Sequence, residues 1–199
     1  MWVVKIGGSM GADPSLPQWL ELLTQLGGGR VALVCGGGRF ADEVRRTQNL
    51  WQFDDLSAHN MAVLGMAQTA YQFHALNPQL QLAARRNDIR RVLLSGRTAV
   101  WLPFELQRDE PDATTQWSHT SDSIALDLAR RLNAERLTVV KSCTVDPEAS
   151  LVQLSETGVL DARFPVLSEG APFTIDVLQK NQLDRMRALL LGEVRYLDS

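Results

Sequence analysis

Cysteine is scarce in this 199-residue chain, and its two thiols, Cys35 and Cys143, both lie in apolar, strand-like runs. This number and placement favour buried free thiols in a reducing compartment over a disulfide framework. The chain also lacks an apolar run of membrane-spanning length and a basic start followed by an apolar stretch. We therefore expect a soluble, cytoplasmic protein that makes no membrane contact.

No charge of one sign dominates the composition. The net charge is −3 and the pI is about 5.6, so nucleic acid is not an expected partner. The three histidines, His59, His74 and His119, have no metal-ligand spacing, so we predict no metal site. The P-loop motif G-x-x-x-x-G-K-[ST] is absent as well, which argues against a P-loop kinase.

Strand-like and helical segments alternate along the chain. This alternation predicts an α/β fold, a three-layer α/β/α sandwich with a mainly parallel central sheet. The absence of linkers and repeats predicts a single domain over residues 1–199. The expected strands are residues 2–6, 31–35, 92–94, 99–102, 137–140, 173–178 and 194–197. The expected helices begin near Pro17, Ala41, Ser57 (as N-cap), Thr120 and Asn181, and residues 108–116 are expected to form a surface loop.

Two glycine turns, Gly7-Gly8-Ser9 and Gly36-Gly37-Gly38, directly follow the first two expected strands. Ligands of parallel α/β sheets bind at the carboxyl ends of the strands, where glycine lets backbone N–H groups approach an anion. A helix that follows such a turn adds a positive N-terminus. Lys5 stands beside the first turn as a point charge suited to phosphate. The two turns together suit the donor and the acceptor of a phosphoryl transfer.

Other interpretations of the glycines are weaker. Glycines can simply allow tight turns, although two such turns beside a lysine make this less attractive. Gly36, Gly38 and Ala41 also fit the dinucleotide pattern G-x-G-x-x-A, with Asp54 and Asp55 near the expected acidic position. That pattern requires the acid at the end of a second strand, and residues 50–60 do not look like one.

Two further charged residues fall at the same predicted edge. Asp122 lies at the start of the helix near residue 120, either as a neighbour of the N-cap (Thr120 or Ser121) or as a partner that keeps Lys5 charged and oriented. Lys141 ends a strand, as a second candidate cation or as a solvated strand-end lysine. Trp117 is a candidate for lining the same site.

Residues 4–9, 36–38 and 120–125, in this order and spacing, resemble the amino acid kinase superfamily, which includes acetylglutamate, glutamate-5, uridylate and isopentenyl phosphate kinases. Within it, the chain most resembles the small archaeal-type kinases of methanofuran biosynthesis. The matching details are residues 59–62, 102–103, 117–123 and 164–165. The resemblance covers nearly the whole chain. It implies transfer of the γ-phosphoryl group of ATP, with Mg²⁺ carried by ATP, to an aminomethylfuran-methyl phosphate, and it is compatible with a homodimer.

The resemblance also implies roles by position. Lys5 would contact the transferring phosphoryl group, Asp122 would organise that lysine, and Lys141 is the further catalytic candidate. The implied ATP and phosphate ligands are Gly7, Gly8, Ser9, Ser142, Asp146 and Lys180. The implied acceptor ligands are Gly36, Gly37, Gly38, Arg39, His59 and Ser121.

The chain departs from the family on the nucleotide side. Residues 142–147 read Ser-Cys-Thr-Val-Asp-Pro where the family commonly has Thr-Asp-Val-Asp-Gly, and a later glycine-rich, lysine-bearing segment is missing. Lys141 and Lys180 are therefore alternatives for the second lysine. Two other functions stay open: an enzyme like uridylate or isopentenyl phosphate kinase, and a non-catalytic nucleotide or metabolite binder. Retention of Lys5 and Asp122 argues against the binder.

Overall fold

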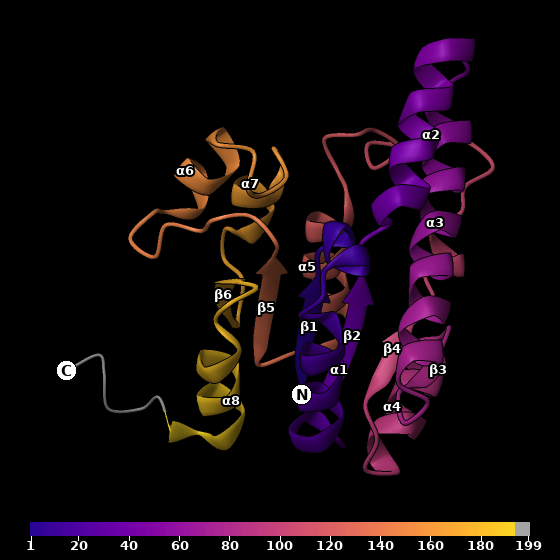
Figure 1. The fold of residues 1–199 in the computed structure, drawn as a ribbon. Coiled ribbons are helices and arrows are strands. Elements are labelled where there is room, and N and C mark those ends of the chain that lie inside the picture. Colours follow the sequence, from indigo (N-terminus) through magenta and orange to yellow (C-terminus); the bar gives the residue numbers. More distant parts are fainter. Residues whose placement is uncertain (194–199) are drawn as a thin grey trace.

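A single parallel β-sheet, whose strand order differs from the order along the chain, organises the molecule (Figure 1). The computed structural model describes residues 1–193. Within this range six strands pair in the order β3-β4-β2-β1-β5-β6, and every pairing is parallel. The strands are β1 (Trp2–Ile6), β2 (Val31–Cys35), β3 (Gln81–Ala83), β4 (Ala99–Trp101), β5 (Arg136–Lys141) and β6 (Thr174–Gln179).

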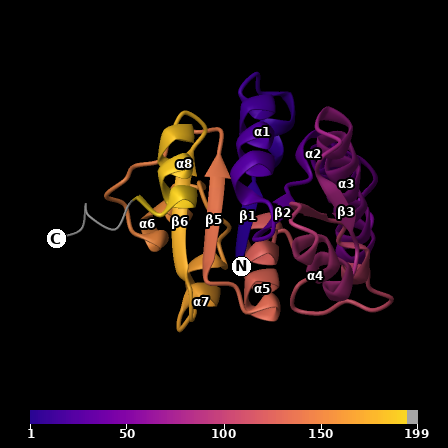
Figure 2. The same ribbon diagram turned by 90° about the horizontal axis from the view of Figure 1, so that it is seen from below.

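Helices cover both faces of this sheet, so the predicted three-layer sandwich is confirmed. Figure 2 shows α1 and α8 on one face and α5 on the other. The helices are α1 (Leu16–Gly27), α2 (Gly38–Trp51), α3 (Asp55–Leu76), α4 (Arg86–Leu94), α5 (Ser121–Leu132), α6 (Leu151–Glu156), α7 (Phe164–Ser168) and α8 (Leu183–Leu191). Short 3-10 helices form at η1 (Gly8–Ala12) and η2 (Phe104–Leu106). None of the helices within residues 1–193 is long and apolar enough to cross a bilayer.

The strands are buried on both faces, which explains their continuous apolar sequences. Because side chains alternate along a strand, Val3 packs into the core cluster shared with α4 and α5. Val4 and Ile6 pack into the second cluster, beneath α1 and α8. Lys5 points to the same face as Val3, toward α5, and only 3% of it is exposed.

The two glycine turns touch each other through their backbones. Gly36 N–H donates to the carbonyl of Ile6. A Cβ atom on Gly8 would lie 2.1 Å from the nitrogen of Gly38, and one on Gly36 would lie 2.4 Å from the nitrogen of Gly8. Gly38 also has a φ of +51°, in the left-handed region. Glycine is therefore required here by the close approach of two main chains.

One expected strand and one expected N-cap are wrong. Residues 92–94 belong to α4, because Ile89 and Leu93, four residues apart, bury one helical face. A short apolar run does not by itself distinguish a strand from a buried helix. The edge strand β3 precedes α4 and was not predicted. The N-cap of α3 is Asp54, whose carboxylate accepts the N–H of Ser57, rather than Ser57 itself.

Of the remaining expectations, some are confirmed, one is wrong, and one concerns residues outside the described range. Cys35 is buried as predicted, whereas Cys143 is exposed in the turn that follows β5. The other expected strands and helices within residues 1–193 are present. The strand expected at residues 194–197 lies outside the described residues.

The contact between the turns predicts a sharp difference between two glycines of η1. Gly8→Ala is expected to destabilise the protein by about 1–3 kcal/mol, because its methyl group would overlap backbone atoms of Gly38. Gly11→Ala is the matched control, since its Cβ would meet nothing closer than 3.7 Å. Urea unfolding of both variants measures the difference, and equal midpoints would contradict the requirement for glycine at the contact.

Candidate functional site

A cavity of about 260 Å³ opens at the carboxyl edge of the sheet, where both glycine turns lie. One wall comes from α2 and α3, which stand beyond this edge in Figure 1. The segment leading into α5 and the segment between α6 and α7 form other walls. Its polar lining includes Lys5, Ser9, Asp42, Arg45, Asp55, His59, Thr115, Gln116, Trp117, His119, Thr120, Ser121, Asp122, Lys141 and Asp161.

Two lysines hold one buried carboxylate at the base of this cavity. The Nζ atom of Lys5 lies 2.5 Å from Oδ1 of Asp122, and the Nζ atom of Lys141 lies 2.7 Å from Oδ2. Asp122 is only 2% exposed. Lys5 is opposite Val139 in the β1–β5 register, so Lys141, two residues further along β5, points to the same face. The first turn of α5 places Asp122 between them.

Asp122 and the two lysines stabilise each other's charged forms, whereas the two lysines oppose each other. Burial alone would raise the pKa of Asp122, but the nearby charges of Lys5 and Lys141 outweigh it and lower that pKa. Burial and the charge of Lys5 lower the pKa of Lys141, against the opposing effect of Asp122. The three-residue cluster alone carries one positive charge in excess, which suits an anionic group placed directly against the two lysines, while Asp42, Asp55 and Asp161 line the cavity around it.

The nucleotide-side residues of the sequence analysis separate in the structure. The hydroxyl oxygens of Ser9 and Ser142 lie 2.6 Å apart, which joins the turn after β1 to the turn after β5. Asp146 is exposed, and its carboxylate accepts the N–H of Glu148 outside the cavity lining. Lys180 forms an ion pair with Asp13 at 2.7 Å. It is therefore Lys141 that the fold brings to Asp122.

The acceptor-side residues also separate. Gly37, Gly38, Ser121 and His59 line the cavity. Gly36 is buried against the first turn and is not part of the lining. Arg39 is also outside the lining, since it is exposed and lies over the ring of Phe40.

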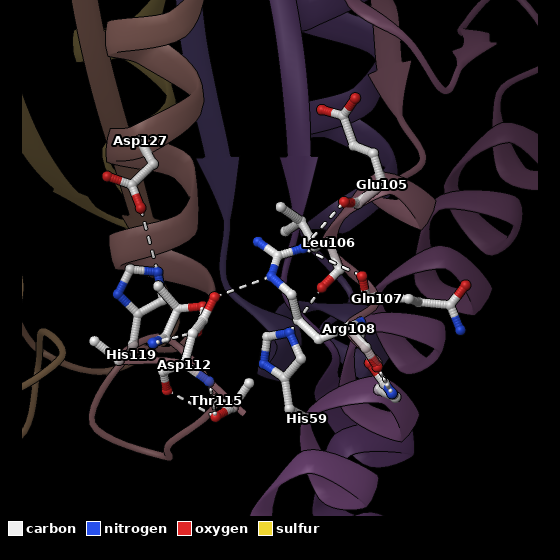
Figure 3. A network of polar contacts seen from close by, with 12 residues as sticks. His59, Glu105, Leu106, Gln107, Arg108, Asp112, Thr115, His119 and Asp127 are labelled. Carbon is white, nitrogen blue, oxygen red and sulfur yellow. Dashed lines mark hydrogen bonds and ion pairs between the residues drawn. The ribbon is translucent and has the colours of Figure 1, made fainter. Parts of the chain in front are cut away.

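The segment before α5 is not only a surface loop, because hydrogen bonds hold part of it against α3 (Figure 3). His59 Nε2 lies 2.9 Å from the carbonyl of Leu106. The side chain of Asn60 both donates to and accepts from the backbone of Arg108, at 2.8 Å each. Arg108 pairs in turn with Asp112, as Figure 3 shows. These contacts tie residues 106–112 to α3.

Trp117 lies on the cavity wall, as the sequence suggested. Its indole N–H donates to Gln48 of α2 at 2.7 Å, and the guanidinium of Arg45 lies 4.2 Å from the ring centroid. His119 is also buried in this wall, 3.3 Å from Asp127 of α5. Neither partner of Trp117 was predicted, because both come from a helix some 70 positions earlier in the chain.

Asp161 is the site residue that sequence reasoning missed. Its carboxylate accepts the backbone N–H groups of Thr120 and Ser123 and the Thr120 hydroxyl. Thr120 is the N-cap residue of α5, as expected, but its side chain makes no capping hydrogen bond to the helix, because its hydroxyl donates to Asp161. No local pattern marks Asp161, since its partners lie about 40 residues away.

Residues 1–144, which include both glycine turns and the Lys5–Asp122–Lys141 cluster, match the model of the amino acid kinase family. The chain belongs to this family. The predicted membership is thus confirmed, and with it the prediction of a phosphotransferase at the level of the family. The roles assigned to individual residues stay predictions.

Named relatives agree with this family. The [5-(aminomethyl)furan-3-yl]methyl phosphate kinase of Methanocaldococcus jannaschii is 23% identical over 206 residues, which cover 97% of this chain and 94% of that protein. Uridylate kinase from Archaeoglobus fulgidus has a TM-score of 0.70 at 16% identity, over 96% of each chain. A substrate complex of isopentenyl phosphate kinase has a TM-score of 0.63 at 13% identity, over 98% of this chain and 97% of that one. The two structures show that the fold is shared.

The buried cluster predicts an asymmetric response to mutation. Asp122→Asn removes the carboxylate that pairs with both ammonium groups, and it should lower the unfolding free energy by about 3–5 kcal/mol. Adding Lys5→Met removes one of those charges and should restore part of the loss. Asp88→Asn, which breaks an exposed ion pair with Arg91, should cost about 0–1 kcal/mol. Urea unfolding tests this order, and equal losses for Asp122→Asn and Asp88→Asn would contradict it.

Proposed function

We propose that this protein is an ATP-dependent kinase that transfers the γ-phosphoryl group to the phosphate of a small phosphate monoester. One observation carries the proposal. Lys5 and Lys141 hold the buried Asp122 beside two glycine turns that touch, all at one edge of the sheet. A reaction between two phosphates needs fixed positive charge and close backbone approach, and this edge provides both.

The chemistry requires no nucleophile from the protein. An oxygen of the acceptor phosphate attacks the γ-phosphorus of ATP, a new P–O bond forms, and the bond from the γ-phosphorus to the β,γ-bridging oxygen breaks to release ADP. The attacking oxygen is already anionic, so no general base is needed. Lys5 and Lys141 stabilise the charge on the transferring group, and Asp122 keeps both ammonium groups oriented.

The two turns divide the substrates. ATP phosphates lie against Gly7, Gly8 and Ser9, with Ser142 on the facing turn. The acceptor phosphate lies against Gly37 and Gly38 at the start of α2, beside Ser121 at the start of α5. The close packing of Gly8 against Gly38 supports this assignment, because it sets donor and acceptor phosphates side by side. Mg²⁺ enters with ATP as part of the substrate and neutralises phosphate charge.

As the acceptor we propose [5-(aminomethyl)furan-3-yl]methyl phosphate, the substrate named for the Methanocaldococcus jannaschii relative. The cavity volume of about 260 Å³ is small for a ligand pocket, which suits a compact acceptor. The wall formed by α2 and α3 carries the carboxylates of Asp42, which pairs with Arg45, and of Asp55, which suits an amino group. Trp117 supplies an aromatic surface for a flat ring.

An acceptor panel tests this proposal. The purified protein is incubated with ATP, Mg²⁺ and one monoester at a time: the aminomethylfuran phosphate, UMP or isopentenyl phosphate. ³¹P NMR should show ADP together with a new diphosphate for the furan compound. Turnover with UMP or isopentenyl phosphate alone would replace the proposed acceptor, and no turnover with any monoester would favour a binding protein.

The three lysines of the chain offer a matched set of variants. Lys5→Met and Lys141→Met should each lower kcat by about 100-fold or more, because each removes a charge that faces the transferring group. Lys180→Met should stay within a few fold of wild type, since Lys180 pairs with Asp13 outside the cavity lining. Steady-state kinetics, with circular dichroism to verify folding, measure the effect. A greater loss in Lys180→Met than in Lys141→Met would reverse the assignment of the second lysine.

A further inference from the structure

We propose that Asp161 is a positioning residue for phosphoryl transfer, which fixes the helix turn that carries Asp122 and places a further carboxylate in the cavity that Lys141 lines. This inference rests on the proposed function. It concerns a residue outside the segment of 1–144 that matches the family model.

The first part of the argument is geometric. The first turn of a helix leaves backbone N–H groups without partners, and the N-cap residue normally satisfies one of them. In α5 this is done by Asp161, which accepts Thr120 N–H at 3.0 Å, Ser123 N–H at 2.9 Å and the Thr120 hydroxyl. These contacts lie on both sides of Asp122 in the sequence. The orientation of the Asp122 side chain therefore depends on Asp161.

Asp161 is itself held firmly. Its carbonyl accepts the hydroxyl of Ser155 and the N–H of Phe164, both at 3.0 Å. Phe164 is completely buried in the core cluster that includes α5. The backbone of Asp161 is thus held by α6 and α7, while its side chain binds α5. Asp161 therefore links the first turn of α5, which carries Asp122, to α6 and α7.

The second part of the argument is electrostatic. Asp161 lines the cavity, and the charged groups that face Lys141 are Lys5 on β1, Asp122 on α5 and Asp161. Burial and Lys5 lower the pKa of Lys141, whereas Asp122 and Asp161 act to raise it. A helix cap without a catalytic role would need only the hydrogen bonds. A carboxylate in the same cavity as Lys141 gives Asp161 a second effect, on the charge that meets the phosphoryl group.

Asp161→Asn tests both effects while keeping the size of the side chain. One oxygen of Asp161 accepts both backbone N–H groups, and the amide oxygen can replace it. The second acceptor, which receives the Thr120 hydroxyl, and the negative charge are lost. We expect kcat to fall between about 10-fold and 100-fold through misplacement of Asp122, with the KM for ATP changed much less. The alkaline limb of the kcat profile should move to lower pH, since Lys141 would lose its proton more readily. Asp88→Asn is the matched control, because Asp88 caps the distant helix α4 with its carboxylate, and it should leave both quantities unchanged.

A measurement without substrates separates this inference from the proposed function. The chain has three lysines, so a ¹³C-lysine label gives three side-chain signals, which the Lys180→Met and Lys141→Met variants assign. In Asp161→Asn the Lys141 signal should titrate at a lower pH than in wild type and in Asp88→Asn. An unmoved Lys141 titration would overturn the proposal even if kcat falls, because helix capping alone gives that result. If no acceptor is phosphorylated by wild type, the proposed function fails, and the lysine titration still decides the electrostatic role of Asp161.

Discussion

The buried carboxylate of Asp122 is the constraint on which the rest of the site depends. Two lysines enter the protein interior at the ends of neighbouring strands, and neither ammonium group would tolerate burial beside the other without a counter-charge. The carboxylate that neutralises them must come from the helix that covers the same face of the sheet. The parallel pairing of β1 with β5 and the packing of α5 over them are thus tied to a single three-residue ion cluster.

The glycine turns add a second constraint, which acts between main chains. The turns after β1 and β2 approach so closely that a methyl group on either would overlap the other. Side chains are excluded from the contact, and backbone N–H groups occupy the surface where two phosphates would meet. The backbone sets the shape of this place, and the lysine cluster adds positive charge to it. The proposed phosphoryl transfer requires both positioning and charge stabilisation.

The sequence predicted the parts of this arrangement that leave a local pattern. Buried strands followed by glycine are visible as apolar runs with a defined end, and Lys5 was recognisable beside such an end. The choice between Lys141 and Lys180 was open, because it depends on strand register. Val139 lies opposite Lys5, so Lys141 faces α5, whereas Lys180 follows β6 and pairs with Asp13.

Other parts could not be predicted, because their determinants are far apart in the chain. The bonds from Asp161 to α5 and from Trp117 to Gln48 span about 40 and 70 residues, and neither end carries a distinctive pattern. The error at residues 92–94 has a different origin, since three apolar residues fit a strand as well as one face of α4.

The two sides of the cavity are built by different means, and this bears on how one fold can serve different acceptors. The lysine side rests on strand ends and backbone contacts in the core, where a substitution disturbs the whole sheet. The opposite wall is the segment before α5. It is joined to α2 and α3 by a few polar contacts, such as those of Asn60 with Arg108 and of Trp117 with Gln48. Such contacts can be exchanged at a cost of about 1 kcal/mol each without moving the sheet. Under the proposed function, the wall next to the acceptor could therefore change in shape and charge while the edge that carries the lysines stays the same.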